Sequence, residues 1–141
     1  MRETIPALPK TIVASIEKYA RDAYAHIAQH KGISLSGVHV AAWCVDVTED
    51  MHHMMKTSPI FDSIKMVSSG EIVTGYHQFL EVKIKGVLYI VDPTWKQVPI
   101  ENKRAPNVMI VESSKIPLFC MKNRVGDIWS KREGIISQED V

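Results

Sequence analysis

The sequence has few of the features that mark specialised protein classes. Its 141 residues include only two cysteines, Cys44 and Cys120, too few for a disulfide framework. The formal net charge is +1, so the chain has no electrostatic signature of a nucleic-acid partner. No apolar run approaches the roughly 20 residues needed to span a bilayer, and the first residues lack the apolar stretch of a signal peptide. These absences predict a cytosolic or otherwise reducing location and no membrane span.

The composition is that of a globular domain. Hydrophobic residues make up 45% and charged residues 23% of the chain, enough apolar material for a core. We therefore expect a single domain over residues 1–141. In residues 10–30 apolar side chains recur at three- and four-residue steps, and Gly32 follows them, which predicts an amphipathic helix. Residues 38–56 predict a second, more buried helix with an apolar stripe made of Val40, Cys44, Val47, Met51, Met54 and Met55.

The segment 51–55, Met-His-His-Met-Met, invites a different interpretation. Thioether and imidazole groups are ligands for soft metals such as copper. The methionines lie on the apolar stripe, however, where methionine commonly fills gaps in a core, and His52 and His53 lie off it. We therefore expect no metal site and no cofactor.

Two extended runs follow, and a short glycine-containing link joins them. Residues 78–85 alternate between apolar and charged side chains, as in a half-buried strand. Residues 87–92 are nearly all apolar, as expected of a strand covered on both faces. A β-hairpin folded about Lys85-Gly86 places Ile84 opposite Val87. Phe79 then falls opposite Asp92, and His77 falls opposite Thr94.

His77 and Asp92 should therefore meet at one end of the sheet. A carboxylate that accepts a hydrogen bond from one imidazole nitrogen fixes the tautomer and leaves the other nitrogen as a base. Pro93 ends the second strand, which predicts that the Asp92 carboxylate lies at a rim. Alternatively, the pair is incidental to a structural module, and the two side chains then point to opposite faces.

The order of elements predicts an α+β fold. Two helices precede several mostly antiparallel strands, including expected strands at residues 63–67 and 107–112. Residues 113–123 are expected to hold one helical turn. Beyond residue 124 few side chains can pack, the candidates being Val125, Ile128, Trp129, Ile135 and Ile136.

A cysteine near the start of a helix, followed by His77 and Asp92 on adjacent strands, is the layout of a cysteine nucleophile with an orienting dyad. The helix N-terminus and an imidazolium both lower a thiol pKa. Together with the segment Tyr89-Ile-Val-Asp-Pro-Thr94, these residues resemble the papain-like, transglutaminase-like cysteine superfamily over residues 33–97. The resemblance is closest to the glutamine-deamidase domains of bacterial toxins and effectors, of the Pasteurella multocida toxin type.

The resemblance implies a papain-like core over roughly residues 33–112, with N-terminal helices packed on the sheet. It leaves two positions for the nucleophile. In one account the second helix begins near Trp43 and Cys44 is the nucleophile in its first turn. In the other the helix begins near Gly37, Cys44 is a core thiol, and His39 occupies the nucleophile position of an altered enzyme. Cys120 has no expected role. Gln78 and Gln97 could each donate an amide to an oxyanion.

The leading hypothesis is a cysteine-dependent amidohydrolase that converts glutamine side chains of a protein substrate to glutamate. Such a substrate could be a host signalling protein, and an effector of this kind would be secreted and act in the host cytosol. A cysteine peptidase or a transglutaminase would use the same groups. The third alternative is a catalytically degenerate domain that binds a partner, with His39 in the nucleophile position.

Overall fold

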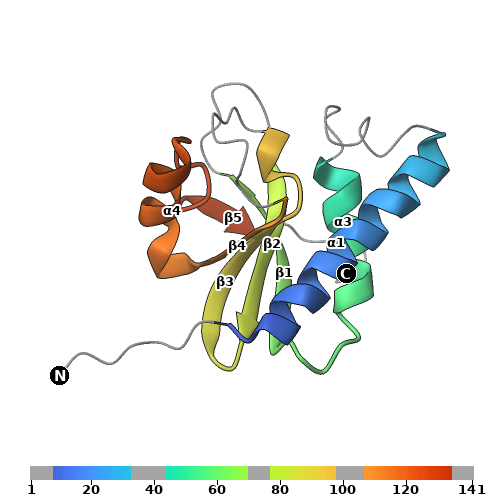
Figure 1. The fold of residues 1–141 in the computed structure, drawn as a ribbon, viewed down its shortest axis with the longest axis horizontal. Coiled ribbons are helices and arrows are strands. Elements are labelled where there is room, and N and C mark those ends of the chain that lie inside the picture. Colours follow the sequence, from blue (N-terminus) through green and yellow to red (C-terminus); the bar gives the residue numbers. More distant parts are fainter. Residues whose placement is uncertain (1–7, 33–43, 70–76, 98–106, 135–141) are drawn as a thin grey trace.

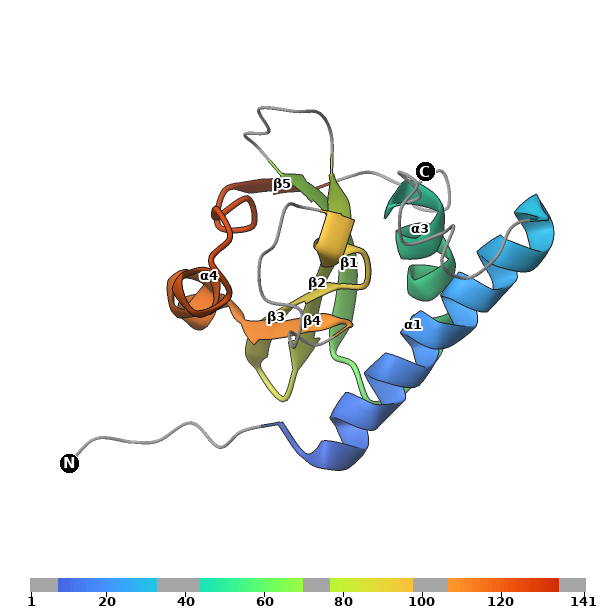
Figure 2. The same cartoon turned by 45° about the horizontal axis from the view of Figure 1, so that its top comes forward.

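The fold is a three-layer α+β arrangement in which helices cover both faces of one antiparallel sheet (Figure 1). A computed structural model describes residues 8–32, 44–69, 77–97 and 107–134. Helices α1 and α3 lie on one face of the sheet and α4 lies on the other, and this holds in both views (Figures 1 and 2). The α+β prediction is thereby confirmed for the described part of the chain.

Three α-helices and two short 3-10 helices are described. The long helix α1 spans Lys10–Lys31, the buried helix α3 spans Cys44–Met55, and α4 spans Ile116–Asn123. The 3-10 helices η1 and η2 span Trp95–Gln97 and Ser113–Lys115. Residues 38–43, which the sequence predicts to begin the second helix, lie outside the described residues.

The sheet contains five strands in the spatial order β4-β3-β2-β1-β5, with every neighbouring pair antiparallel. The strands span Ser63–Ser69 (β1), Gln78–Ile84 (β2), Val87–Asp92 (β3), Met109–Glu112 (β4) and Arg132–Gly134 (β5). The central hairpin β2–β3 therefore carries the residues on which the functional interpretation depends.

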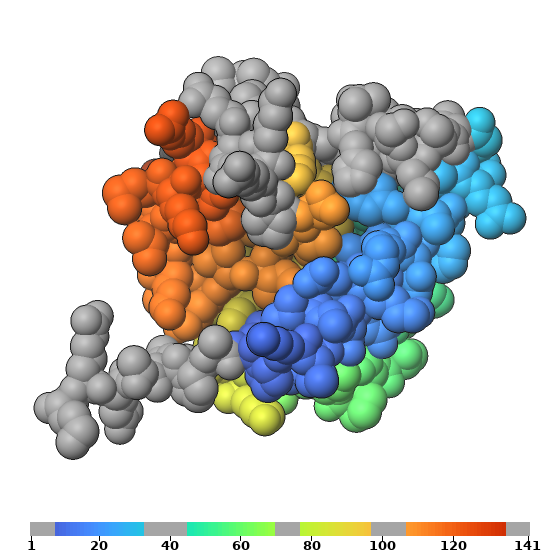
Figure 3. All heavy atoms as spheres, in the orientation of Figure 1, coloured from blue at the N-terminus to red at the C-terminus, as the bar shows by residue number. Residues whose placement is uncertain are grey.

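Helix α1 forms where its periodicity predicts it. Ile16, Ala20 and Ala23 are fully buried against the sheet and α3, and Ile12 and Ile27 are partly buried. Gly32 ends the helix in the left-handed conformation, with φ of 67°, and its N–H bonds to the carbonyls of the last turn. The outer, polar face of α1 runs obliquely across the molecule beside the C-terminal half of the chain (Figure 3).

The hairpin has the predicted register. Ile84 pairs with Val87 and Leu80 with Val91, and the three pairs between them keep the same register. Lys85 and Gly86 have φ of 49° and 80°, the pair of positive values that a two-residue type I′ turn requires. The Asp62 carboxylate accepts a hydrogen bond from the Gly86 N–H at 2.9 Å and ties the turn to the start of β1.

Strands β2 and β3 divide the interior into two cores. Leu80, Val82 and Val91 face α1 and α3, while Phe79 and Ile90 face the opposite layer. The second layer is built from Trp95, Met109, Ile116, Cys120, Val125 and Trp129. Coverage of β3 on both faces agrees with its almost continuous apolar sequence.

The C-terminal part is more ordered than the sequence predicts. Where one helical turn is expected, η2 and α4 together occupy residues 113–123, and residues 132–134 add the edge strand β5. Trp129 is fully buried. The prediction underestimated this region because its apolar residues are sparse and non-periodic, and their burial depends on a sheet face supplied by distant strands.

The type I′ turn generates a stability prediction. A Cβ added at Gly86 meets no atom within 4 Å, so Gly86→Ala introduces only the strain of a left-handed L-residue. We expect it to lower the free energy of unfolding by about 1–2 kcal/mol, measured by urea denaturation. Gly126→Ala is the matched control, because its added Cβ also meets nothing within 4 Å and its φ is not positive. Equal effects of the two substitutions would contradict the strain explanation.

Candidate active site

Three elements of the fold bring their ends together at one end of the sheet. The chain leaves α3 at Met55 and enters β1 at Ser63, so α3 runs antiparallel to β1 and its first turn lies near the end of β1 (Figure 1). At that same end β2 begins and β3 ends, because β1 pairs antiparallel with β2 and β2 pairs antiparallel with β3. Cys44, His77 and Asp92 occupy these three element ends.

His77 and Asp92 form a direct, buried hydrogen bond. The distance from His77 Nε2 to Asp92 Oδ2 is 2.6 Å, and the side chains are 8% and 0% exposed. A carboxylate only accepts, so Nε2 carries the proton in this bond, and the second ring nitrogen Nδ1 is the basic one in the neutral ring. The two side chains therefore meet, and the alternative in which they point to opposite faces is wrong.

Asp92 accepts four hydrogen bonds in a site with no exposed surface. Oδ2 accepts from His77 Nε2 and, at 2.8 Å, from Trp129 Nε1. Oδ1 accepts from the backbone N–H of Thr94 at 3.0 Å and from its hydroxyl at 3.3 Å. Such a set of donors compensates a carboxylate for the loss of water. Asp92 ends β3 and lies at the end of the sheet, as predicted. The sequence did not predict that its carboxylate is fully buried, with the Trp129 indole donating to it.

Hydrogen bonds to the backbone of Trp129 and its neighbour Ser130 fix the loop that carries the Trp129 side chain. The Asp127 carboxylate accepts hydrogen bonds from the N–H groups of Trp129 and Ser130. Arg132 donates to the Trp129 carbonyl at 3.0 Å while its Nε bonds to Glu81 of β2 at 2.7 Å. Burial alone would raise the pKa of Asp127, but these N–H donors, the Ser130 hydroxyl and the nearby Arg132 charge hold the pKa below its ordinary value. The loop that places the Trp129 indole against Asp92 is therefore fixed by its own hydrogen bonds.

The two N-terminal helices each contact the backbone beside one member of the His77–Asp92 pair. The Tyr24 hydroxyl of α1 donates to the carbonyl of Pro93 at 2.6 Å. The Thr48 hydroxyl of α3 donates to the carbonyl of Gln78 at 3.3 Å. Both helical residues are buried, so these contacts lie inside the molecule.

The other predicted residues fall in several places. Cys44 is the first residue of α3, one helical turn before Thr48, and His39 lies outside the described residues. Gln78 begins β2 with a buried side chain, and Gln97 ends η1. Cys120 lies in the core beneath α4, where burial and, to a smaller extent, the charge of Asp127 raise its thiol pKa to about 11.

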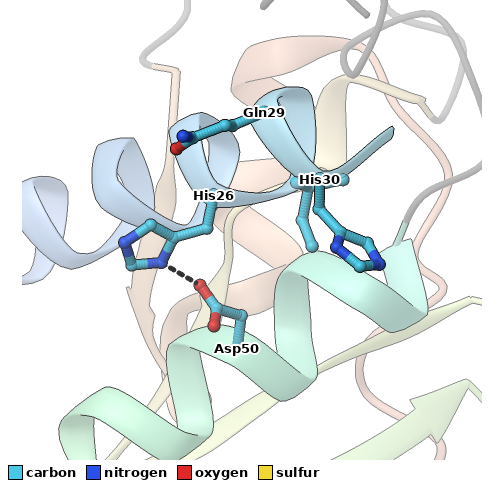
Figure 4. Close-up of a pocket in the computed structure, with 5 residues that line it drawn as sticks. His26, Gln29, His30 and Asp50 are labelled. Atoms are coloured by element: carbon cyan, nitrogen blue, oxygen red, sulfur yellow. Dashed lines mark hydrogen bonds and ion pairs between the residues drawn. The ribbon is translucent and has the colours of Figure 1, made fainter. Parts of the chain in front are cut away.

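A second histidine–carboxylate pair lies between α1 and α3. His26 Nδ1 is 2.8 Å from Asp50 Oδ2, beside a hollow also lined by Ile27, Gln29 and His30 (Figure 4). This pair differs from His77–Asp92 in its access to water, because the side chains are 54% and 27% exposed. The exposed His26–Asp50 pair can therefore be compared with the buried His77–Asp92 pair in experiments that test what burial contributes.

The methionines of α3 belong to the apolar core. Met51 and Met55 are fully buried between α3 and the sheet, which supports their assignment to the core. Within residues 8–32, 44–69, 77–97 and 107–134, no group of three or more His, Cys, Asp or Glu side chains could hold a metal ion.

No helix in the same ranges is long and apolar enough to cross a membrane.

Comparison of the chain with protein-family models, with curated proteins and with solved structures gives no match. The functional interpretation therefore depends on the residues and their geometry.

The Trp129–Asp92 contact generates the second prediction. Trp129→Phe removes the N–H donor from a buried carboxylate and should lower the free energy of unfolding by about 1.5–3 kcal/mol in addition to the loss of ring area. The measurement is a double-mutant cycle with Asp92→Asn, which separates the charged hydrogen bond from packing. A coupling energy near zero would show that the indole only fills space.

Proposed function

We propose that this protein is a cysteine-dependent amidohydrolase that acts on side-chain amides of proteins, with Cys44 as nucleophile, His77 as acid and base, and Asp92 as the residue that orients His77. The observation that supports it most strongly is the buried hydrogen bond between His77 and Asp92 at the end of the sheet where α3 begins. A His–carboxylate pair that is almost completely buried at that position has an evident chemical use and is costly to retain otherwise.

The first half-reaction forms a thioester. Nδ1 of His77 takes the proton of the Cys44 thiol, and the thiolate attacks the carbon of a glutamine carboxamide. The tetrahedral intermediate collapses when the imidazolium returns its proton to the leaving nitrogen, which departs as ammonia. Asp92 holds Nε2–H throughout and stabilises the imidazolium.

The second half-reaction consumes water. His77 removes a proton from a water molecule, whose oxygen attacks the thioester carbonyl. The carbon–sulfur bond then breaks, glutamate is released, and the sulfur leaves as thiolate or takes the proton from the imidazolium. The backbone N–H groups in the first turn of α3 are suitable donors for the oxyanion of both intermediates.

The position of Cys44 in α3 supports its role. Thr48 contacts the backbone of Gln78, the residue that follows His77. Position 44 precedes Thr48 by four residues, which returns to nearly the same face of an α-helix at an axial rise of about 6 Å. The backbone at position 44 thus lies on the face of α3 directed toward the start of β2, at the N-terminus, where a thiolate is stabilised.

We infer further that the domain belongs with papain-like, transglutaminase-like enzymes and acts as a glutamine deamidase of the bacterial effector type. This inference depends on the motif from His77 to Thr94 and on the fold order of helices before an antiparallel sheet. Peptide cleavage and transamidation use the same three residues, and they differ in which amide reaches the sulfur and which nucleophile resolves the thioester.

The second candidate is a binding domain without catalysis, in which His39 occupies the nucleophile position. It is favoured by the unbroken apolar stripe of α3, since Val47 and Met51 are fully buried and Cys44 continues their spacing. The two candidates differ in the reactivity of the Cys44 thiol.

Activity is tested by incubation with glutamine-containing proteins and mass spectrometry. Deamidation adds about 1 Da at the modified glutamine, and the substitutions Cys44→Ser, His77→Asn or Asp92→Asn should lower the rate by about a thousandfold or more. His26→Asn, which removes the exposed pair, should leave the rate unchanged. Peptide cleavage or amine incorporation in place of the mass shift would replace the deamidase assignment with one of the related activities.

Thiol reactivity gives an independent test. Iodoacetamide should alkylate Cys44 below about pH 7, because the proposed imidazolium and helix terminus lower its pKa, and His77→Asn should slow this reaction. Cys120 is the internal control: its pKa of about 11 keeps it a thiol at that pH, so its peptide should remain unmodified. A Cys44 that reacts only when the protein is unfolded would favour the binding domain.

A further inference from the structure

Tyr24 and Thr48 occupy equivalent positions around the site, although they come from different helices. Tyr24 donates its hydroxyl to the carbonyl of Pro93, the residue after Asp92, and Thr48 donates to the carbonyl of Gln78, the residue after His77. Helix α1 is therefore hydrogen-bonded to the residue that follows Asp92, and α3 to the residue that follows His77. No helix–strand hydrogen bond of this kind is needed for the α+β packing itself, which the apolar residues supply.

These contacts have a positional consequence. Pro93 and Gln78 lie where β3 ends and β2 begins, beyond the last residues that β2 and β3 pair with each other, Leu80 and Val91. On its other side Gln78 pairs with Ser68 of β1, and the His77 carbonyl accepts from the Ser69 N–H at 3.0 Å. Backbone at the end of a ladder has fewer hydrogen bonds to fix it than backbone in the middle. A hydroxyl donated from a packed helix adds a constraint where the β2–β3 pairing has stopped, at the peptides that follow His77 and Asp92.

The Tyr24 and Thr48 hydroxyls are buried donors whose hydrogen bonds to the two carbonyls are shielded from water. Thr48 is fully buried and Tyr24 is 7% exposed, so water does not compete for either carbonyl at these contacts. Burial, and to a smaller extent the negative charge of Asp92, raise the pKa of the Tyr24 hydroxyl far above its ordinary value. Tyr24 therefore remains a protonated donor at neutral pH.

We propose that Tyr24 and Thr48 are positioning residues that hold the His77–Asp92 pair in register with the first turn of α3. Neither touches the reacting atoms. Tyr24 sets the distance from α1 to the Asp92 end of β3, and Thr48 sets the distance from α3 to the His77 end of β2. This inference refines the proposed function, but its central measurement on His77 does not require that function to be correct.

The test uses near-isosteric variants of the full chain that remove one hydroxyl each, Tyr24→Phe and Thr48→Val. Thr48→Ser keeps the donor and should restore the behaviour of the original protein. Two matched controls lie in the same helical layer. Thr57→Val removes a hydroxyl–carbonyl bond of the same 3.3 Å length that is exposed and stays within the chain turn after α3, so it controls for loss of a threonine hydroxyl away from the site. Tyr19→Phe removes a tyrosine hydroxyl from α1 where the ring packs against Phe61.

The first readout is the nitrogen-bound ring proton of His77, observed by NMR in isotope-labelled protein. Its hydrogen bond to a buried carboxylate should give a downfield, slowly exchanging signal. In Tyr24→Phe and Thr48→Val we expect exchange to accelerate by about five- to tenfold, the equivalent of one lost hydrogen bond in local opening. Thr48→Ser, Thr57→Val and Tyr19→Phe should keep the original exchange rate.

The second readout is the rate of Cys44 alkylation at pH 6, which should fall by a similar factor in the first two variants and stay unchanged in the other three. If Tyr24→Phe and Thr48→Val lower only the melting temperature and leave the ring-proton exchange unchanged, the two hydroxyls are structural and the positioning proposal is wrong. If exchange accelerates while Cys44 is unreactive in the original protein, the positioning proposal holds and the proposed cysteine chemistry fails.

Discussion

The buried carboxylate of Asp92 is the constraint on which the rest of the structure depends. A charged group with no exposed surface requires compensation by several donors at fixed positions. The chain supplies them from His77 before β2, from Thr94 just after β3, and from Trp129 in the loop before β5. The observed strand order, with β5 beside β1, brings these three segments to one carboxylate.

The hydrogen bonds link the two cores. Trp129 belongs to the core beneath α4, whereas Tyr24 belongs to the core beneath α1 and α3, and both bond to consecutive residues, Asp92 and Pro93. A shift of either helical layer would therefore disturb the same short segment. Such convergence on one short segment restricts how far Asp92 can move relative to either helical layer.

The sequence was most informative where the physics is local. The Lys85-Gly86 turn determined the hairpin register, and the register placed His77 beside Asp92. The periodicity of residues 10–30 and the single Gly32 were enough to define α1. By contrast, the Trp129 indole reaches Asp92 across 37 positions of sequence, and the Tyr24 hydroxyl reaches Pro93 across 69. No local pattern marks such contacts, because each depends on how separate layers pack. The buried state of Asp92 was missed for that reason.

The tight turn at Lys85-Gly86 also has a practical consequence. It lies at the end of the sheet opposite to His77 and Asp92, since β2 runs the length of the sheet between them, and both turn residues are exposed. Its geometry is fixed by two backbone angles and by Asp62. A fluorophore or surface tether attached to the Lys85 amine would therefore be held by a rigid turn, with the His77–Asp92 end of the sheet directed away from the surface and open to an approaching macromolecule.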